Sequence, residues 1–160
     1  MSVQTPATRA LEGSNLSFSL VQTEPPTSAE QSAALQGITI GQLLRTIVIR
    51  RGARDYVFVL VPAGRQIDWP RLRAHLGVNR LSLPDQDEAK EATGYERGAI
   101  TPFGSATSWP VIADASVAGR GAVAIGGGAR GVNLHVDADA LILALHAEVA
   151  DVTRAVETPA

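Results

Sequence analysis

Two glycine-bearing segments constrain the fold of this chain more than any other feature of its sequence. The first is Gly-Ala-Ile-Thr-Pro-Phe-Gly over residues 98–104, and the second is Gly-Gly-Gly-Ala-Arg-Gly over residues 126–131. Each follows or interrupts a strand-like run, and glycine is used where the backbone bends unusually or lies close to a ligand. The two segments therefore indicate a pocket walled by main chain.

Each segment, taken alone, also has a plain structural explanation. The second lacks the Lys-Ser/Thr ending of a phosphate loop and the spacing of a dinucleotide fingerprint, so by itself it is more typical of a tight turn between two strands. In the first, Pro102 fixes an extended backbone at Thr101 and removes a hydrogen-bond donor. That arrangement suits a rigid loop against a ligand and an ordinary proline turn equally well.

The residues around the two segments predict an α+β domain with a mixed, largely antiparallel sheet. Two strands rich in β-branched residues are joined by Arg51-Gly52-Ala53-Arg54, which indicates a hairpin. Hairpins mixed with isolated helices favour this fold class over strict strand-helix alternation. Strands are expected at 16–20, 45–50, 56–62, 80–83, 110–114, 121–125 and 132–136. Helices are expected at 5–11, from a capping box at 27–30 to 35, from Asp68 to Gly77, at 84–93, and from Asp137 to about 147.

The length of the chain, 160 residues, fits a single domain over residues 1–160, with the residues after about 154 expected to fray. The absence of cysteine excludes disulfides, thiolate nucleophiles and cysteine zinc sites. Residues 1–16 lack the basic start and apolar run of a signal peptide, and no stretch is long enough for a membrane span. We expect a cytoplasmic protein with no membrane partner.

Charge is distributed unevenly, although the net charge of -2 gives no general argument for nucleic-acid binding. Eight arginines and two aspartates lie between Arg45 and Arg80, whereas residues 81–96 carry five acids and one lysine. The basic stretch could attract phosphates. An ordinary solvated surface is the preferred explanation until the fold gathers those arginines in one place.

Other candidate groups have structural explanations. The three histidines show no metal-ligand spacing, two aspartates fit helix capping better than a catalytic pair, and two tryptophans beside prolines suit loop anchoring. We therefore predict no metal or cofactor site. The residues concerned are His75, His135, His146, Asp137, Asp139, Trp69 and Trp109.

Short motifs follow one another in order along nearly the whole chain, and none is specific alone. They are Thr-Pro at 5–6, Leu-Arg-Thr-Ile-Val at 44–48, Asp-Trp-Pro-Arg-Leu at 68–72, Ala-Thr-Gly-Tyr at 92–95, the first glycine segment, a Pro-(apolar)-Asp strand at 110–114, Gly-Gly-Ala-Arg-Gly at 127–131 and a helix start at 137–141. Together they resemble the YbaK-type aminoacyl-tRNA deacylase family, which includes the editing domain of bacterial prolyl-tRNA synthetases and its free-standing relatives.

This resemblance implies a barrel-like sheet with surrounding helices and a pocket that hydrolyses the ester of a mischarged tRNA. In the family a GxxxP loop holds the substrate through its backbone, so the resemblance assigns catalytic roles to Gly98, Thr101 and Pro102. Fixed N–H groups can stabilise a developing oxyanion without a side-chain nucleophile. Water, or a group on the substrate itself, would then attack the ester.

The resemblance also implies the substrate-binding residues and the partners. The partners are the acceptor end of an aminoacyl-tRNA and, as a second candidate, an aminoacyl-tRNA synthetase; no cofactor is implied, and the oligomeric state is left open. The binding residues are Thr46, Ile100, Phe103, Gly126, Gly127, Gly128, Arg130 and Asn133.

Three positions depart from the family pattern. Arg45 stands where the family has a catalytically important lysine; it keeps the charge but does not transfer a proton at neutral pH. Gly126 replaces a small hydroxyl residue, and Asn133 replaces an acid. Three hypotheses therefore stay open: a trans-editing hydrolase with Arg45 as an electrostatic stabiliser, a catalytically impaired module that binds a tRNA end or a synthetase, and a small-molecule pocket unrelated to tRNA.

Overall fold

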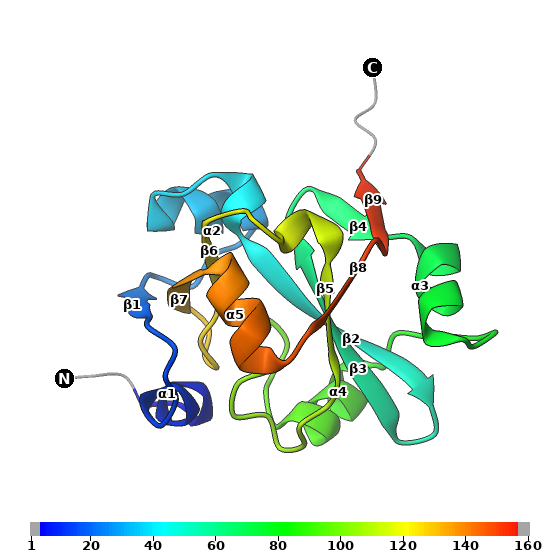
Figure 1. Ribbon diagram of the computed structural model, residues 1–160. Helices are drawn as coiled ribbons and strands as arrows, with labels where there is room; N and C mark the ends of the chain where they lie inside the picture. The colour runs from blue at the N-terminus through cyan, green and yellow to red at the C-terminus, as the bar shows by residue number, and fades with distance from the viewer. Residues whose placement is uncertain (1–3, 157–160) are drawn as a thin grey trace.

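A computed structural model describes residues 4–156, and Figure 1 shows how their helices and strands are arranged. The helices are α1 (Pro6–Glu12), α2 (Ala29–Gln36), α3 (Trp69–Leu76), α4 (Gln86–Thr93) and α5 (Ala138–Leu145), with short 3-10 helices η1 (Ile40–Gln42) and η2 (Ala115–Val117). The strands are β1 (Ser19–Gln22), β2 (Leu44–Gly52), β3 (Asp55–Pro62), β4 (Arg65–Ile67), β5 (Val111–Asp114), β6 (Ala122–Gly126), β7 (Val132–Asp137), β8 (Glu148–Ala150) and β9 (Thr153–Ala155).

The described strands form three sheets. One has the order β2-β3-β5-β8, antiparallel between β2 and β3 and parallel from β3 to β5 to β8. The second is the antiparallel sheet β1-β7-β6, and the third pairs β4 with β9. The predicted α+β class with a mixed sheet is confirmed. A parallel bridge between Leu43 and Ala124 joins the two larger sheets, and within residues 4–156 the strands do not close into a barrel.

Alternation along β2 and β3 divides their side chains between two hydrophobic cores, because successive residues of a strand point to opposite faces. Val48, Phe58 and Leu60 belong to the core that also contains residues of the three-stranded sheet, α1 and α5. Ile49 and Val57 belong to a second core with Leu72 of α3. The inner strands β3 and β5 are thus buried on both faces, which explains their nearly continuous apolar sequence.

Three expectations about local structure are wrong in detail. The cap of α2 is Ser28, whose hydroxyl accepts from the Gln31 N–H, while the Gln31 side chain accepts from the Thr27 N–H. The helix therefore begins one residue later than predicted, and it has no capping box at Ser28, because the Gln31 side chain bonds the residue before the cap. The strand expected at 80–83 is one bridge between Arg50 and Ser82, because Pro84 follows at once. The strand expected at 16–20 forms only as β1, while Leu16 and Phe18 pack against the core without pairing.

Strand β9 extends one residue into the segment expected to fray. Ala155, which follows Arg154, pairs with Arg65 of β4. Strands β4, β8 and β9 have three residues each, which is too short for a periodic pattern in the sequence. Residues 157–160, to which the expected fraying also applied, lie outside the described residues.

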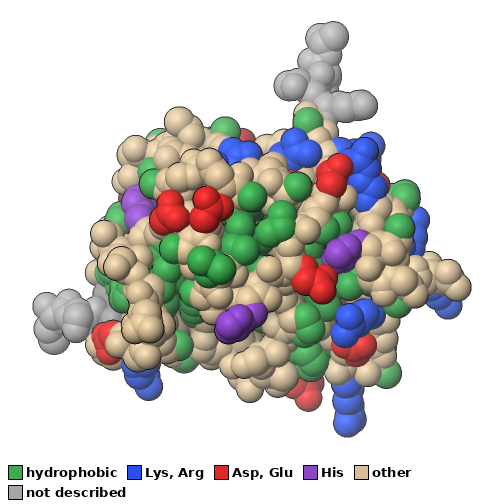
Figure 2. Space-filling view, in the orientation of Figure 1, with side chains coloured by type: hydrophobic (Ala, Val, Ile, Leu, Met, Phe, Trp, Pro, Cys, Tyr) green, Lys and Arg blue, Asp and Glu red, His purple; other side chains and the backbone are tan. Residues whose placement is uncertain are grey.

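Figure 2 shows the face that carries α5 and β8, where hydrophobic side chains gather near the middle and most arginine and lysine side chains lie toward the edges. Leu143 of α5 and Val149 of β8 are exposed. Among residues 4–156, no helix combines the length and the apolar character that a membrane crossing requires.

Candidate functional site

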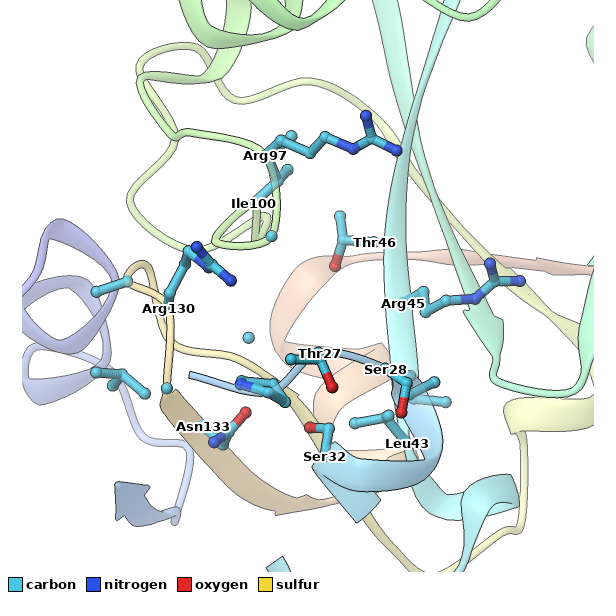
Figure 3. Close-up of a pocket in the computed structure, with 18 of the residues that line it drawn as sticks. Thr27, Ser28, Ser32, Leu43, Arg45, Thr46, Arg97, Ile100, Arg130 and Asn133 are labelled. Carbon is cyan, nitrogen blue, oxygen red and sulfur yellow. The ribbon is translucent and has the colours of Figure 1, made fainter. Parts of the chain in front are cut away.

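The two glycine segments meet at one cavity of about 620 Å³, which we call the first lobe. Its walls come from β2, the start of α2, the first segment and the turn that leads from β6 into β7 (Figure 3). Hydroxyl, amide and guanidinium groups line it together with backbone, and its lining contains no acid among the described residues. The polar side chains are those of Thr27, Ser28, Ser32, Arg45, Thr46, Gln86, Arg97, Arg130 and Asn133.

The first lobe lies where the edge of β2 has no neighbouring strand. β2 is an outer strand of its sheet. Among residues 4–156, its free side is bridged at two places only, from Leu43, just before the strand, to Ala124 and from Arg50 to Ser82. Between these two bridges, Leu44, Arg45 and Thr46 line the cavity. The cavity is therefore an opening between the two larger sheets.

The two glycine segments pack directly against one another. A side chain at Gly126 would place its Cβ 3.3 Å from the Ile100 carbonyl oxygen and 3.9 Å from that of Ala99. A Cβ at Gly98, whose φ is +87°, would lie 3.8 Å from the Arg130 side chain. Glycine at these positions lets carbonyl oxygens of the first segment approach the second, and lets Arg130 lie across the first.

Both segments also rest on the first turn of α1. The Thr5 hydroxyl donates to the Gly127 carbonyl at 2.6 Å, and it caps α1 by accepting from the Thr8 N–H. A Cβ at Gly104 would lie 2.4 Å from the carbonyl carbon of Pro6, so only glycine fits there. The Tyr95 hydroxyl donates to the Phe103 carbonyl at 2.6 Å, and burial raises its pKa, which keeps the proton on this donor.

The second segment is also the tight turn that the sequence offered as an alternative. The Gly127 N–H donates to the Val132 carbonyl, and the Val132 N–H donates to the Ala129 carbonyl. Gly128 and Gly131 have positive φ angles of 93° and 79°. One structure thus satisfies both interpretations, because a hairpin turn forms a wall of the cavity.

Three arginines line the first lobe, and they are oriented differently (Figure 3). Arg97, which directly precedes the first glycine segment, and Arg130 of the second reach over the cavity, and neither has a hydrogen bond or ion pair with another described residue. Arg45 lies on the other side of β2 from Thr46, with its Nη2 2.6 Å from the Arg65 carbonyl oxygen. The alternation of side chains along β2 causes this difference.

The predicted site residues fall into two groups. Those that line the first lobe are Arg45, Thr46, Gly98, Ile100, Gly126, Arg130 and Asn133. Those outside its lining are Thr101, Pro102, Phe103, Gly127 and Gly128. Phe103 lies in the hydrophobic core, and a side chain on Gly128 would meet Tyr95 and Thr5 instead of the cavity.

The sequence did not identify Arg97 as a site residue, nor the hydroxyl-bearing residues at and near the start of α2. Arg97 directly precedes the first glycine segment, and that adjacency was an available signal. Thr27, Ser28 and Ser32 were explained by helix capping or passed over. No local pattern marks them as cavity residues, because they reach the site only through the fold.

Two buried hydroxyls of the site region lack a hydrogen-bond partner. They belong to Thr46, which lines the first lobe, and to Thr101, whose side chain is fully buried in the first segment. Within residues 4–156 no other group satisfies them. Leaving such a group unpaired costs about 1–3 kcal/mol, so these hydroxyls are unfavourable for folding alone.

The other candidate groups have structural partners. His75 lies 2.8 Å from Glu148, His135 lies 2.9 Å from Gln36, and the Trp109 indole donates to the Ala92 carbonyl, which anchors its loop. Asp137 caps α5, as predicted. Across the described part of the chain, no three histidine, aspartate or glutamate side chains gather as a metal site would require.

Comparison with known proteins identifies the family and the fold. Residues 23–143 match the family model described as the aminoacyl-tRNA editing domain. The chain is 22% identical over 136 residues to EbsC of Enterococcus faecalis, named as a candidate Cys-tRNA(Pro)/Cys-tRNA(Cys) deacylase; the match covers 85% of this chain and 83% of that one. It is 30% identical over 100 residues to the multifunctional Ser/Thr-tRNA deacylase ProXp-y of Escherichia coli K12, covering 61% of this chain and 60% of that protein.

A solved structure shows the same fold. It is titled as a candidate trans-editing enzyme for prolyl-tRNA synthetase, and it superposes with a TM-score of 0.79 at 23% identity, covering 95% of this chain and 99% of its own. The matched residues 23–143 include β2 and both glycine segments. The chain belongs to the aminoacyl-tRNA editing domain family.

Proposed function

We propose that this protein is a trans-editing hydrolase that cleaves the ester bond of a mischarged aminoacyl-tRNA. The observation that carries the proposal is the first lobe, whose backbone walls come from both glycine segments. Two arginines that have no partner among residues 4–156 reach over it. Membership of the editing-domain family and the deacylases among its relatives support the same activity.

Backbone carbonyls would hold the amino acid. The Ile100 carbonyl oxygen lies close to Gly126, and both residues line the cavity; carbonyl oxygens accept hydrogen bonds from an α-ammonium group. Arg97 and Arg130 would bind phosphates of the acceptor end, since guanidinium groups grip phosphate oxygens in pairs. The absence of acids from the lining of the described cavity leaves both arginines available for this task.

Water would be the nucleophile in this reaction. Its oxygen attacks the ester carbonyl carbon, the bond from that carbon to the ribose oxygen breaks, and the ribose oxygen takes up a proton. No side-chain nucleophile is required, so the protein contributes positioning and electrostatic stabilisation. Gly98 would contribute through its backbone, and Thr101 and Pro102, which lie outside the lining, would hold the first segment in shape.

Arg45 would contribute charge to the site from β2. Its guanidinium bonds to the Arg65 carbonyl, so it would act from the far side of β2 or after leaving that bond. If Arg45 is the electrostatic stabiliser, Arg45→Ala should lose more activity than Arg45→Lys. If both variants lose equally little activity, the stabilising positive charge comes from Arg97 and Arg130 instead.

The decisive experiment is a deacylation panel that covers all aminoacyl-tRNAs, with Gly126→Ala as the test variant. An added methyl group at Gly126 crowds the Ile100 carbonyl at 3.3 Å, and we expect about a tenfold loss in kcat/KM with a folded protein. Gly13→Ala is the matched control, because its Cβ would meet only the Ala10 carbonyl oxygen at 3.8 Å. Wild-type protein that hydrolyses no member of the panel would rule out the enzyme.

A binding module that holds a tRNA end, or a synthetase, without hydrolysis is the second candidate. The orientation of Arg45 favours this second candidate. Arg45 occupies the position of the family lysine, and its guanidinium group donates a hydrogen bond to the Arg65 carbonyl. Filter binding over a salt series separates the two functions. The binding module predicts tight, salt-sensitive tRNA binding with turnover at the background rate.

A further inference from the structure

Helix α2 and strand β7 meet beside the first lobe, and each directs two polar side chains toward the other. Ser32 and Gln36 are four residues apart in α2, so they share one face of the helix. Asn133 and His135 are two residues apart in β7, so they share one face of the strand. Figure 3 shows that Ser32 and Asn133 line the lobe from these two elements, with their side-chain oxygens turned toward one another. Outside the lining, the His135 Nε2 lies 2.9 Å from the Gln36 Oε1 and ties the two elements together.

A chain of hydrogen bonds orients the Ser32 hydroxyl. The Gln36 Nε2 donates to the Ser32 Oγ at 2.9 Å, so the Gln36 Oε1 is the acceptor for His135. Burial lowers the pKa of His135, so its ring is neutral at neutral pH and carries its single N–H on Nε2. While Gln36 bonds the Ser32 oxygen, the hydroxyl hydrogen donates to no other group among residues 4–156. Ser32 therefore offers a hydrogen-bond donor to the cavity.

Asn133 supplies the matching acceptor. Its Nδ2 donates to the Val21 carbonyl at 3.3 Å, and no described residue donates to its Oδ1. A hydroxyl accepts from one partner and donates to another, so a ligand hydroxyl would satisfy Ser32 and Asn133 together. A methyl group would satisfy neither, an ammonium group has no lone pair for Ser32, and a carboxylate has no proton for Asn133. The pair is therefore complementary to a hydroxyl group.

We propose that Ser32 is the specificity-determining residue of the first lobe, that Gln36 and His135 are its positioning residues, and that the lobe selects an amino acid whose side chain carries a hydroxyl. This inference rests on the proposed function, because it assigns the amino acid of the ester to the first lobe. A site built to bond a substrate hydroxyl rejects the analogue that lacks it, since the buried groups of the site are then left unpaired. Ser32 and Gln36 are each 8% exposed, so water reaches them poorly.

A pair of esters on one tRNA tests the selection. After correction for the uncatalysed rates, wild-type protein should hydrolyse the seryl ester with a kcat/KM about tenfold above that of the alanyl ester, because alanine lacks only the hydroxyl. Ser32→Ala should remove this preference by slowing the seryl reaction, while the alanyl reaction changes little. The ratio of the two rates does not depend on the folded fraction of a variant, so partial unfolding cannot imitate this result.

Variants of His135 test the positioning role. His135→Phe leaves Gln36 without a donor, so the preference for serine should fall about threefold, and His135→Gln, which restores an N–H, should recover it. His75→Ala is the matched control, because His75 lies outside the first lobe and is 2.8 Å from Glu148. NMR of the imidazole nitrogens should find the His135 proton on Nε2 at neutral pH. A proton on Nδ1, or an unchanged preference in His135→Phe, would overturn the positioning role.

Binding without turnover separates this inference from the proposed function. L-serinamide and L-alaninamide carry the two side chains without the ester, and serinamide should bind with a Kd about tenfold lower and shift the side-chain amide signal of Asn133. Equal hydrolysis of the two esters, or no preference between the two amides, would overturn the inference even if tRNA is deacylated. A preference for serinamide without hydrolysis of any ester would refute the proposed activity and leave the selective site standing.

Discussion

Asp114 and the hydroxyls of Thr46 and Thr101 are all buried polar groups, but the fold surrounds them in opposite ways. Asp114 is 1% exposed and accepts from the Val152 N–H, the Ser116 N–H and the Ser116 hydroxyl, with Arg65 at 3.8 Å. The two threonine hydroxyls have no partner within the described structure. Asp114 lies at the end of β5, whereas Thr46 faces the cavity and Thr101 lies in the first glycine segment.

This contrast separates a buried polar group that stabilises the fold from buried polar groups that cost stability and are explained better by a role in the site. A buried carboxylate is tolerated only when its oxygens are satisfied, and then removing it leaves its donors unpaired. A buried hydroxyl without a partner costs stability in the free protein. We therefore expect substitutions at Asp114 to affect stability, and substitutions at the threonines to affect activity.

Asp114→Ala should have the largest effect. It leaves the buried Val152 N–H without an acceptor and removes charged hydrogen bonds, for a loss of about 3 kcal/mol in the free energy of unfolding. Urea denaturation measures this loss. The control is Asp151→Ala, since Asp151 is exposed and pairs with Arg71 at 3.0 Å; its loss should stay below about 1 kcal/mol. Similar losses in the free energy of unfolding for both variants would show that Asp114 has no special role in the fold.

The second-largest effect should come from low pH, which should reduce the contribution of Asp114 to the free energy of unfolding. Burial by itself raises the pKa of Asp114, but the hydrogen bonds from Ser116 and Val152 outweigh it and hold the pKa below its ordinary value. A lowered folded pKa gives stability that is full above the unfolded pKa of about 4 and is lost as pH falls through the folded value. The stability difference between wild type and Asp114→Asn should therefore shrink below about pH 4. A difference independent of pH would contradict this account.

Thr46→Val and Thr101→Val should have the smallest effects on stability. Each keeps the shape of the side chain and removes an unpaired hydroxyl, so the free energy of unfolding should stay equal or rise by up to about 1 kcal/mol. Deacylation by Thr46→Val should nevertheless fall, because Thr46 lines both the first lobe and a second lobe that adjoins it. Destabilisation of both variants by more than about 1 kcal/mol would show that these hydroxyls serve the fold.

Much of the fold could be predicted from the sequence because its signals are local. The apolar runs of β2 and β3, the Asp68 and Asp137 caps and the glycine ends of α2 and α3 all act within a few residues. Strands of three residues gave no such signal, and β9 is held by pairing with β4 across a long separation in sequence. The parallel additions of β5 and β8 likewise depend on the complete sheet.

The candidate site could be predicted only in part, for the same physical reason. The glycine segments were identified because their composition is unusual, and the structure brings both to one cavity. The direction of Arg45 depends on which face of β2 it occupies, and that is decided by packing on both sides of the sheet. Arg97 and the hydroxyl-bearing residues near α2 line the cavity only because the fold brings together segments that are distant in the sequence.

The first turn of α1 sets the distance between the two walls of the cavity, although it contributes nothing to the lining. Thr5 holds the Gly127 carbonyl, and Gly104 lies against Pro6. Changes in these few residues would move one wall relative to the other and leave the residues around the ester intact. A family that needs to accept a larger or smaller amino acid could thus adjust its selectivity from outside the pocket, so the substrate of a relative cannot be assigned from its cavity residues alone.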